Sequence, residues 1–131
     1  MTPATYLDSS AIVKLVIDEP ESTALRRYLR RRRPVVSSAL ARTEVARAVL
    51  LEGDTALARA RDVLSRIELI RVNDRVLNAA GELHPIEVRS LDAIHLATAQ
   101  QLGPDLGRLV AYDERVLEAA DTLGLRTHAP H

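Results

Sequence analysis

Four acidic side chains that lie far apart in the sequence form the candidate chemical centre of this chain. Asp8 and Asp113 each follow a short apolar run typical of a buried strand, and Asp92 lies in the first turn of a predicted helix. Glu44 lies on a predicted helical stripe that is otherwise apolar. Carboxylates gathered at ~4 to 5 Å repel one another by ~3 to 4 kcal/mol per pair at an effective dielectric of about 20, so such a cluster needs a compensating cation. Oxygen ligands without cysteine suit Mg²⁺, with Mn²⁺ as the alternative.

Each of these carboxylates also has an ordinary structural interpretation. Asp8 and Asp113 can each act as the N-cap of the helix that follows. Asp92 can complement the dipole of its own helix, and Glu44 can pair with Arg47 along the same helix face. The hypothesis of a shared site therefore depends on all four residues meeting at one edge of the fold.

The elements that must position these residues alternate between strands and helices. Strands are predicted at residues 4–7, 34–37, 67–72, 109–112 and 125–127. Helices are predicted at residues 9–17, 20–32, 39–51, 55–66, 73–82, 90–99 and 113–122. Because the strands run apolar without a two-residue alternation, we expect one α/β domain over residues 1–131, with a mostly parallel central sheet of about five short strands covered by helices on both faces. Such sheets place their sites at the carboxyl ends of the strands, near a change in strand order.

Two of the predicted helices carry the inner acidic residues. The helix at 90–99 is apolar on nearly every side, which predicts that it is buried, with Ser90 as its N-cap. His95 on this helix is expected to be structural, because a buried histidine usually satisfies a local hydrogen bond. In the helix at 39–51, Glu44 shares its predicted core-facing stripe with Leu40, Ala48 and Leu51.

Composition narrows the class of protein. At 131 residues, with 47% hydrophobic and 27% charged residues, the chain has the balance of an ordinary globular domain. The absence of cysteine excludes disulfides, thiolate catalysis and cysteine-based zinc sites, and aromatic residues at 2% argue against a base-stacking platform. No apolar run approaches the ~20 residues of a membrane span, and a strand is predicted in place of a signal peptide, so we expect a cytoplasmic protein without a membrane partner.

Positive charge is concentrated in one stretch although the formal net charge is zero. All but one of the 18 basic residues are arginines, and Arg30 and Arg31 lie in a run of them that ends at Arg33. This run can contact RNA phosphates, meet an acidic protein partner, or form a solvated helix face. Lys14, in the helix after Asp8, can make a similar contact or lie at the surface.

Four segments of the chain resemble the PIN-domain family, specifically the VapC-type toxins of bacterial toxin–antitoxin pairs. They are LDSSAIVKL at 7–15, TEVARA at 43–48, LDAIHLATA at 91–99 and YDERVL at 112–117. The resemblance covers nearly the whole chain and has all four acidic positions in order. It implies a compact PIN fold, a Mg²⁺-dependent endoribonuclease activity on an RNA substrate, a VapB-like antitoxin partner and a homodimer.

The resemblance also assigns roles to individual residues. Asp8 and Asp92 are implied to be the principal metal ligands, with Asp113 as a further ligand and Glu44 as a ligand or base. Ser9 or Ser10 can hydrogen-bond a ligand carboxylate, and either hydroxyl can instead cap a helix. The chain departs from the family at Ala111, where a hydroxyl residue often lies two places before the last aspartate.

Other functions remain to be separated from this one. A dehalogenase-type phosphatase needs a second aspartate two residues after the first, where this chain has Ser10, and a receiver domain needs a lysine near its fifth strand. Both therefore fit poorly. The stronger alternative is a PIN-fold binding module of weak catalytic power that acts by binding protein or RNA.

Overall fold

Five parallel strands form the centre of the fold, in the order β3-β2-β1-β4-β5. The structure is a computed structural model, which describes residues 2–131. The strands are β1 (Ala4–Leu7), β2 (Val35–Ser38), β3 (Glu68–Ile70), β4 (Leu106–Val110) and β5 (Thr127–His128). The predicted α/β class with a parallel sheet of five short strands is therefore confirmed.

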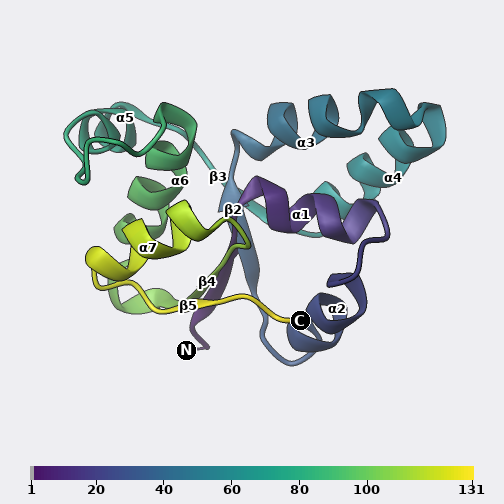
Figure 1. The fold of residues 1–131 in the computed structure, drawn as a ribbon, viewed down its shortest axis with the longest axis horizontal. Coiled ribbons are helices and arrows are strands. Elements are labelled where there is room, and N and C mark those ends of the chain that lie inside the picture. Colours follow the sequence, from purple (N-terminus) through teal and green to yellow (C-terminus); the bar gives the residue numbers. More distant parts are fainter. Residues whose placement is uncertain (1) are drawn as a thin grey trace.

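Helices lie on both sides of this sheet, which Figure 1 shows between two helical layers. One layer contains α1 (Ser9–Val16), α2 (Ser22–Leu29), α3 (Ala41–Val49), the short 3₁₀ helix η1 (Leu50–Glu52) and α4 (Asp54–Ser65). The other contains α5 (Asp74–Gly81), α6 (Ser90–Gln101), the 3₁₀ helix η2 (Gly103–Asp105) and α7 (Glu114–Thr122). No helix within residues 2–131 is both long and apolar enough to span a bilayer.

Alternation along the strands divides the apolar residues into two cores. In β1, Leu7 belongs to the core beneath α1, α3 and α4, whereas Tyr6 belongs to the core beneath α6 and α7. Val35 and Val36 in β2 divide in the same way. Because both faces of the inner strands β1 and β2 are covered, every residue of these two strands is buried, including the polar residues Thr5, Ser37 and Ser38.

The strand order changes direction at β1, and this change opens the edge that carries the acidic residues. β1 lies between β2, which follows it in the chain, and β4, which returns after α6. The connections from β1 and β4 leave this edge toward opposite layers, into α1 and α7 respectively. A crevice at the carboxyl ends of two such strands is the usual site of ligand binding in a parallel α/β sheet.

Several local predictions were wrong, each for a physical reason. β4 covers Leu106–Val110 rather than 109–112, because Leu106 already pairs with Ala4 of β1. Ser90 does not cap α6: it is the first helical residue, Arg89 occupies the N-cap position, and no side chain caps this helix.

The predicted core-facing stripe of α3 was also wrong. The buried residues are Ala41, Val45 and Val49, whereas Leu51 is 100% exposed. The helix begins only at Ala41, and its phase turns the apolar stripe by one position relative to the prediction. Glu44 consequently lies beside the core-facing stripe, half-buried, and faces the other helical layer.

Candidate active site

Asp8 and Asp113 lie at the carboxyl ends of the paired strands β1 and β4. Leu7 pairs with Val110, and the Asp8 backbone N–H donates to the Val110 carbonyl at 3.2 Å. Each aspartate is also the N-cap of the next helix: Asp8 Oδ1 accepts the Ala11 N–H at 2.9 Å, and Asp113 Oδ1 accepts the Arg115 N–H at 2.8 Å. Within residues 2–131 neither Oδ2 atom has a hydrogen-bond partner, so capping leaves one oxygen of each carboxylate for a ligand.

Asp92 faces Asp113 across a small pocket in the first turn of α6. Both side chains line this pocket of about 30 Å³ together with Arg89, Arg115 and three further residues. Burial raises the pKa of Asp92, and the neighbouring charge of Asp113 raises it further. Within the described residues Asp92 forms no ion pair, and the nearby charges of His95 and Arg89 only partly offset the rise in its pKa.

Glu44 is held by His95, a contact that the sequence did not predict. His95 Nε2 lies 2.7 Å from Glu44 Oε1 and 3.0 Å from Ser9 Oγ, and Ser9 Oγ donates to Glu44 Oε1 at 2.6 Å. The alternative partner Arg47 forms no ion pair within residues 2–131. Burial raises the pKa of Glu44, but the hydrogen bonds from His95 and Ser9 outweigh burial and lower it overall.

Tyr6 fixes the far side of the His95 ring. Its hydroxyl lies 2.7 Å from His95 Nδ1, and both side chains are buried. Because burial raises the pKa of Tyr6, the phenol stays protonated and can donate to Nδ1. The histidine proton then lies on Nε2, where it donates toward Glu44. The hydrogen bonds of His95 are therefore not the local ones that the sequence predicted, but join α6 to β1 and to the candidate carboxylate Glu44.

Asp8 is the most deeply buried of the four carboxylates, with 5% of its surface exposed. Burial raises its pKa, and the charge of Asp92 adds to this effect, although hydrogen bonds from the Ala11 N–H and the Ser10 hydroxyl oppose it. The Ser10 Oγ donates to Asp8 Oδ1 at 2.8 Å. Ser9 and Ser10 therefore each contact one carboxylate of the group, Glu44 and Asp8 respectively.

The four carboxylates gather at one edge of the sheet without forming a ready-made cage. Within residues 2–131, no group of three or more potential ligands is close enough to hold a metal ion as the side chains stand. The donor set nevertheless fits a hard cation: it consists of carboxylate oxygens, it is electrostatically coupled, and each member keeps an oxygen free of hydrogen bonds within the described chain.

Comparison with known proteins decides the family. The model of the PIN domain family matches residues 5–122 of this chain. Ribonuclease VapC46 from Mycobacterium tuberculosis (strain ATCC 25618 / H37Rv) is 62% identical over 127 residues, which are 97% of this chain and 98% of the relative. The chain belongs to the VapC family of PIN-domain ribonucleases. Ribonuclease VapC47 from M. tuberculosis (strain CDC 1551 / Oshkosh) is 37% identical, over 95% of this chain and 96% of that protein.

Solved structures share the fold of this PIN domain at low sequence identity. M. tuberculosis VapC20, described as a Sarcin-Ricin loop cleaving toxin, superposes with a TM-score of 0.76 at 18% identity, covering 96% of this chain and 99% of that one. A toxin–antitoxin complex from Klebsiella pneumoniae superposes with a TM-score of 0.75 at 21% identity, covering 97% and 98% of the two chains. These matches show that the VapC fold extends over nearly the whole chain.

Further side chains of the PIN domain were singled out from the sequence, and the structure places each of them. Ala111 is fully buried in the core beneath α7, so this position offers Asp113 no polar contact. Lys14 pairs with Glu21 at 2.7 Å and lies over the Tyr112 ring, which favours an internal role for its ammonium group. Arg30 and Arg31 are exposed and lie away from the carboxylates, beside the C-terminus.

Arg89 and Arg115, which line the pocket of Asp92 and Asp113, were not predicted from the sequence. Their signal was local: Arg89 precedes Asp92 by three residues, and Arg115 follows Asp113 by two. Arg89 opposes the rise in the pKa of Asp92. These two guanidinium groups therefore bring positive charge into the same pocket as Asp92 and Asp113.

Asp8→Asn is expected to stabilise the metal-free PIN domain at neutral pH. Because the folded-state pKa of Asp8 is raised, its ionisation costs folding free energy: the contribution of this residue to stability is greatest at acidic pH and is lost as the pH rises through the raised pKa. Asparagine keeps the Oδ1 acceptor but carries no charge, so the free energy of unfolding at pH 7 should increase by on the order of 1 kcal/mol. Urea unfolding in chelator between acidic and neutral pH measures this, with exposed Asp54→Asn as the control. Identical profiles for wild type and Asp8→Asn would contradict it.

Proposed function

We propose that this chain is a Mg²⁺-dependent endoribonuclease, with Mn²⁺ as a substitute ion, and the toxin of a toxin–antitoxin pair. The observation that carries the proposal is the convergence of Asp8, Asp92, Asp113 and Glu44 at the carboxyl ends of β1 and β4, with carboxylate charge that nearby positive groups only partly offset. The names of its relatives, Ribonuclease VapC46 and VapC47, support RNA as the substrate.

In this mechanism the carboxylates have different roles. Asp8, Asp92 and Asp113 would hold the ion through the oxygens that make no hydrogen bond, while the N-cap bonds keep Asp8 and Asp113 in place. The chemistry supplied by bound Mg²⁺ is polarisation of the scissile phosphate and a lowered pKa of water. Glu44 acts as ligand or general base. Its lowered pKa keeps it ionised at neutral pH, which suits a metal ligand and makes it a weaker base than an ordinary glutamate.

His95 and Ser9 orient Glu44 for this role. Both contact Oε1, so within the described residues Oε2 is the oxygen that is free to receive a proton or contact the ion. Since Tyr6 holds the opposite ring nitrogen, the carboxylate is positioned by a chain of hydrogen bonds that reaches into the core. The proposed nuclease therefore depends on buried residues as well as on the exposed acidic edge.

RNA cleavage should require the metal ion, and the pH below which cleavage is lost (the acid limit) should depend on the concentration of that ion. Protons and Mg²⁺ compete for Asp8 and Asp92, whose raised pKa values place protonation above the ordinary carboxyl range. Activity should be lost in chelator, recover on addition of Mg²⁺ or Mn²⁺, and fall as the pH is lowered. A rise in Mg²⁺ concentration of about tenfold should shift this fall to lower pH by up to about one unit. Initial cleavage rates across pH at two Mg²⁺ concentrations measure both effects. Cleavage that persists in chelator, or an acid limit that does not move, would contradict the metal mechanism.

A second candidate is a PIN-fold binding module of weak catalytic power. The observation that favours it is the lack of a preformed metal cage within residues 2–131. Calorimetric titration with Mg²⁺ separates the two candidates, because a binding module would show neither ion binding nor ion-dependent cleavage.

The proposed partners are a VapB-like antitoxin and a second copy of the chain. A toxin–antitoxin complex among proteins of the same fold supports the first, and family resemblance supports the homodimer. A toxin that cleaves RNA and is neutralised by its antitoxin acts in the cytoplasm. Light scattering of the protein, alone and with its co-expressed antitoxin, tests both assemblies.

A further inference from the structure

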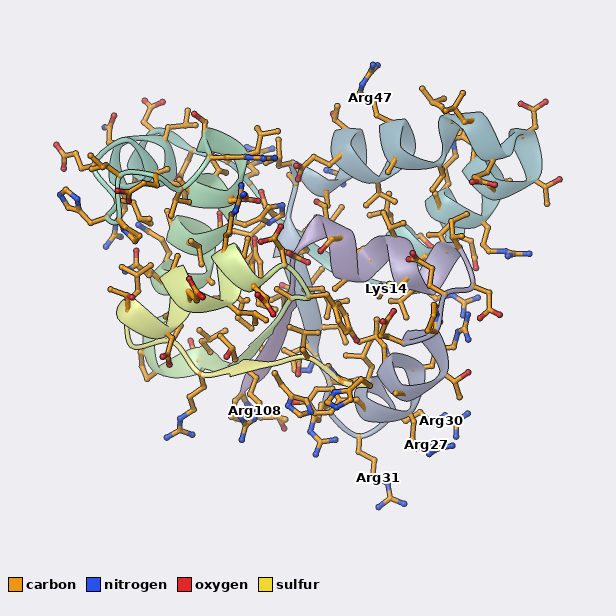
Figure 2. All side chains as sticks on the ribbon, viewed as in Figure 1. Lys14, Arg27, Arg30, Arg31, Arg47 and Arg108 are labelled. Carbon is orange, nitrogen blue, oxygen red and sulfur yellow. The ribbon has the colours of Figure 1, made fainter. Side chains whose placement is uncertain are left out.

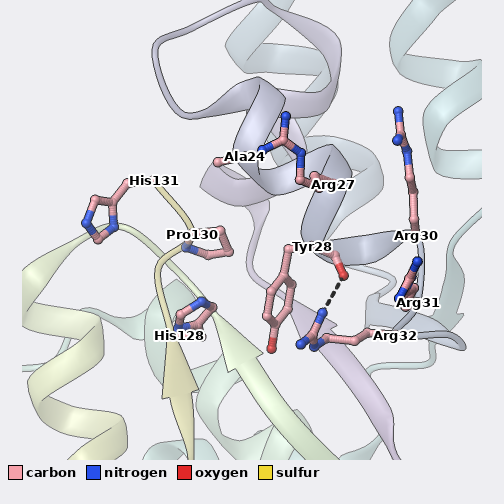
Figure 3. A pocket seen from close by; sticks show the side chains of 9 residues that line it. All are labelled: Ala24, Arg27, Tyr28, Arg30, Arg31, Arg32, His128, Pro130 and His131. Atoms are coloured by element: carbon pink, nitrogen blue, oxygen red, sulfur yellow. Dashed lines mark hydrogen bonds between the residues drawn. The ribbon is translucent and has the colours of Figure 1, made fainter.

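Eight basic side chains at one end of the molecule form a basic surface. This basic surface consists of Arg27, Arg30, Arg31, Arg32, Arg108, Arg126, His128 and His131. It comprises a pocket of about 700 Å³ between α2 and the C-terminal residues (Figure 3) and an adjoining pocket of about 220 Å³, which share Tyr28, Arg31 and Arg32. Within residues 2–131, no aspartate or glutamate lines either pocket, and none of these arginines forms an ion pair.

The positive charge of this surface is local. The chain as a whole has a formal net charge of zero, so the surface is an uncompensated patch rather than part of a generally basic protein. The pKa of His128 reflects this positive charge. Burial lowers the pKa, and the nearby charges of Arg108, Arg32 and His131 lower it further. Such a site favours an anionic ligand that brings several negative charges.

Tyr28 gives the surface a rigid centre. Its ring lies between the Arg32 guanidinium, 4.0 Å from the ring centroid, and the His128 ring, whose centroid is 4.7 Å away. The Tyr28 hydroxyl is buried and has no hydrogen-bond partner within residues 2–131. The exposed arginines around the ring, and not this buried hydroxyl, are therefore the groups that an anion can reach.

The basic surface and the carboxylates lie toward opposite ends of the sheet. The smaller pocket is lined by Thr2, Pro3 and Thr5 around the start of β1, whereas Asp8 follows the end of that strand. Five residues of extended chain from Pro3 to Asp8 span roughly 17 Å, the rise of about five stacked nucleotides. Figure 2 shows Arg27, Arg30, Arg31 and Arg108 on this side of the molecule, and Arg47 on the opposite side.

We infer that the basic surface is a second RNA-binding site, which holds backbone phosphates of the substrate several nucleotides away from the bond that is cut. The inference rests on the proposed cleavage of RNA. Guanidinium groups bind phosphates bidentately without reading sequence, and six arginines over two joined pockets suit a continuous phosphate backbone. A protein partner would need an apolar centre, but among residues 2–131 only Ala24 and Pro130 are aliphatic residues that line the larger pocket.

The direct test compares two double variants of equal charge. Arg27→Gln/Arg31→Gln removes two exposed arginines of the basic surface, and Arg47→Gln/Arg61→Gln removes two arginines of α3 and α4 that lie outside it. Both are made in Asp8→Asn protein so that RNA is not consumed, and melting curves establish that both fold. The probe is fluorescein-labelled bulk transfer RNA, with Kd measured by anisotropy over a salt series.

The basic-surface variant should bind RNA about tenfold more weakly, and the slope of log K against log salt should fall by about 0.7 to 0.9 for each phosphate that is no longer neutralised. The control variant should keep the affinity of its Asp8→Asn parent within about twofold. Equal affinities for the two variants overturn the inference. Unchanged RNA binding combined with abolished antitoxin binding also overturns it and assigns the surface to a protein partner. Because binding is measured without cleavage, the comparison still decides the matter if the wild-type protein does not cut RNA.

Discussion

Replacing Asp8 with asparagine should reduce RNA cleavage by on the order of 10³-fold, because electrostatic groups at a reacting centre typically account for 10²- to 10³-fold each and Asp8 is the most buried proposed ligand. The substitution preserves the size of the side chain and the oxygen that caps α1. The loss should therefore appear in kcat while the fold is retained. Single-turnover cleavage of RNA in saturating Mg²⁺ measures it.

The matched control is Asp54→Asn, which makes the same change at the exposed first residue of α4. It should cleave RNA at the wild-type rate. The two substitutions at Asp8 and Asp54 thus separate loss of a site carboxylate from loss of an aspartate in general. Asp8→Asn protein that retains wild-type cleavage would remove Asp8 from the mechanism, and with it the metal site as proposed.

Replacing His95 with alanine should lower the free energy of unfolding by about 3 kcal/mol and reduce cleavage as well. His95 is 2% exposed, and its removal leaves a cavity, deprives the Tyr6 hydroxyl of its partner and leaves the Ser9 hydroxyl with Glu44 alone. It also removes the strongest influence that holds the pKa of Glu44 down, so burial should then raise that pKa. Urea unfolding and the pH dependence of cleavage measure the two effects.

Two further variants test how His95 acts. His84→Ala, at a loop position outside the site, controls for loss of an imidazole and should leave stability unchanged. Tyr6→Phe removes only the hydroxyl that contacts Nδ1, and should cost about 1 kcal/mol with a smaller loss of cleavage. A His95→Ala protein as stable as wild type would show that the hydrogen-bond network contributes nothing to folding.

Much of the fold was predictable because the pattern that encodes it is local. The strands β1 and β2 begin with short runs without polar–apolar alternation and are buried on both faces, and the helices between them have apolar stripes, so the parallel sheet follows from short stretches of sequence. The limits of β4 were not predictable in this way. Its first residue is defined by pairing with Ala4, about a hundred positions away in the chain.

The sequence identified the candidate carboxylates, but it did not identify the hydrogen bonds that hold them. Residue type and position at strand ends identified Asp8 and Asp113 as candidates, and the structure places them on neighbouring strands. Glu44 was selected from a stripe that proved to be displaced by one residue, yet it faces the site because His95 of the opposite layer reaches it. No local signal links Tyr6, Ser9 and His95, since they meet only after β1 has entered the sheet beside β4.

The order in which the sheet is assembled has a consequence during synthesis on the ribosome. β1 cannot pair with β4 until that strand has been synthesised, about a hundred residues later. A nascent chain that has not yet released residues 106–113 already carries Asp8, Glu44 and Asp92, and its β2 can pair with β1. It lacks β4 on the other side of β1, and it lacks the fourth carboxylate. The proposed site therefore cannot be completed until residues 106–113 have left the ribosome.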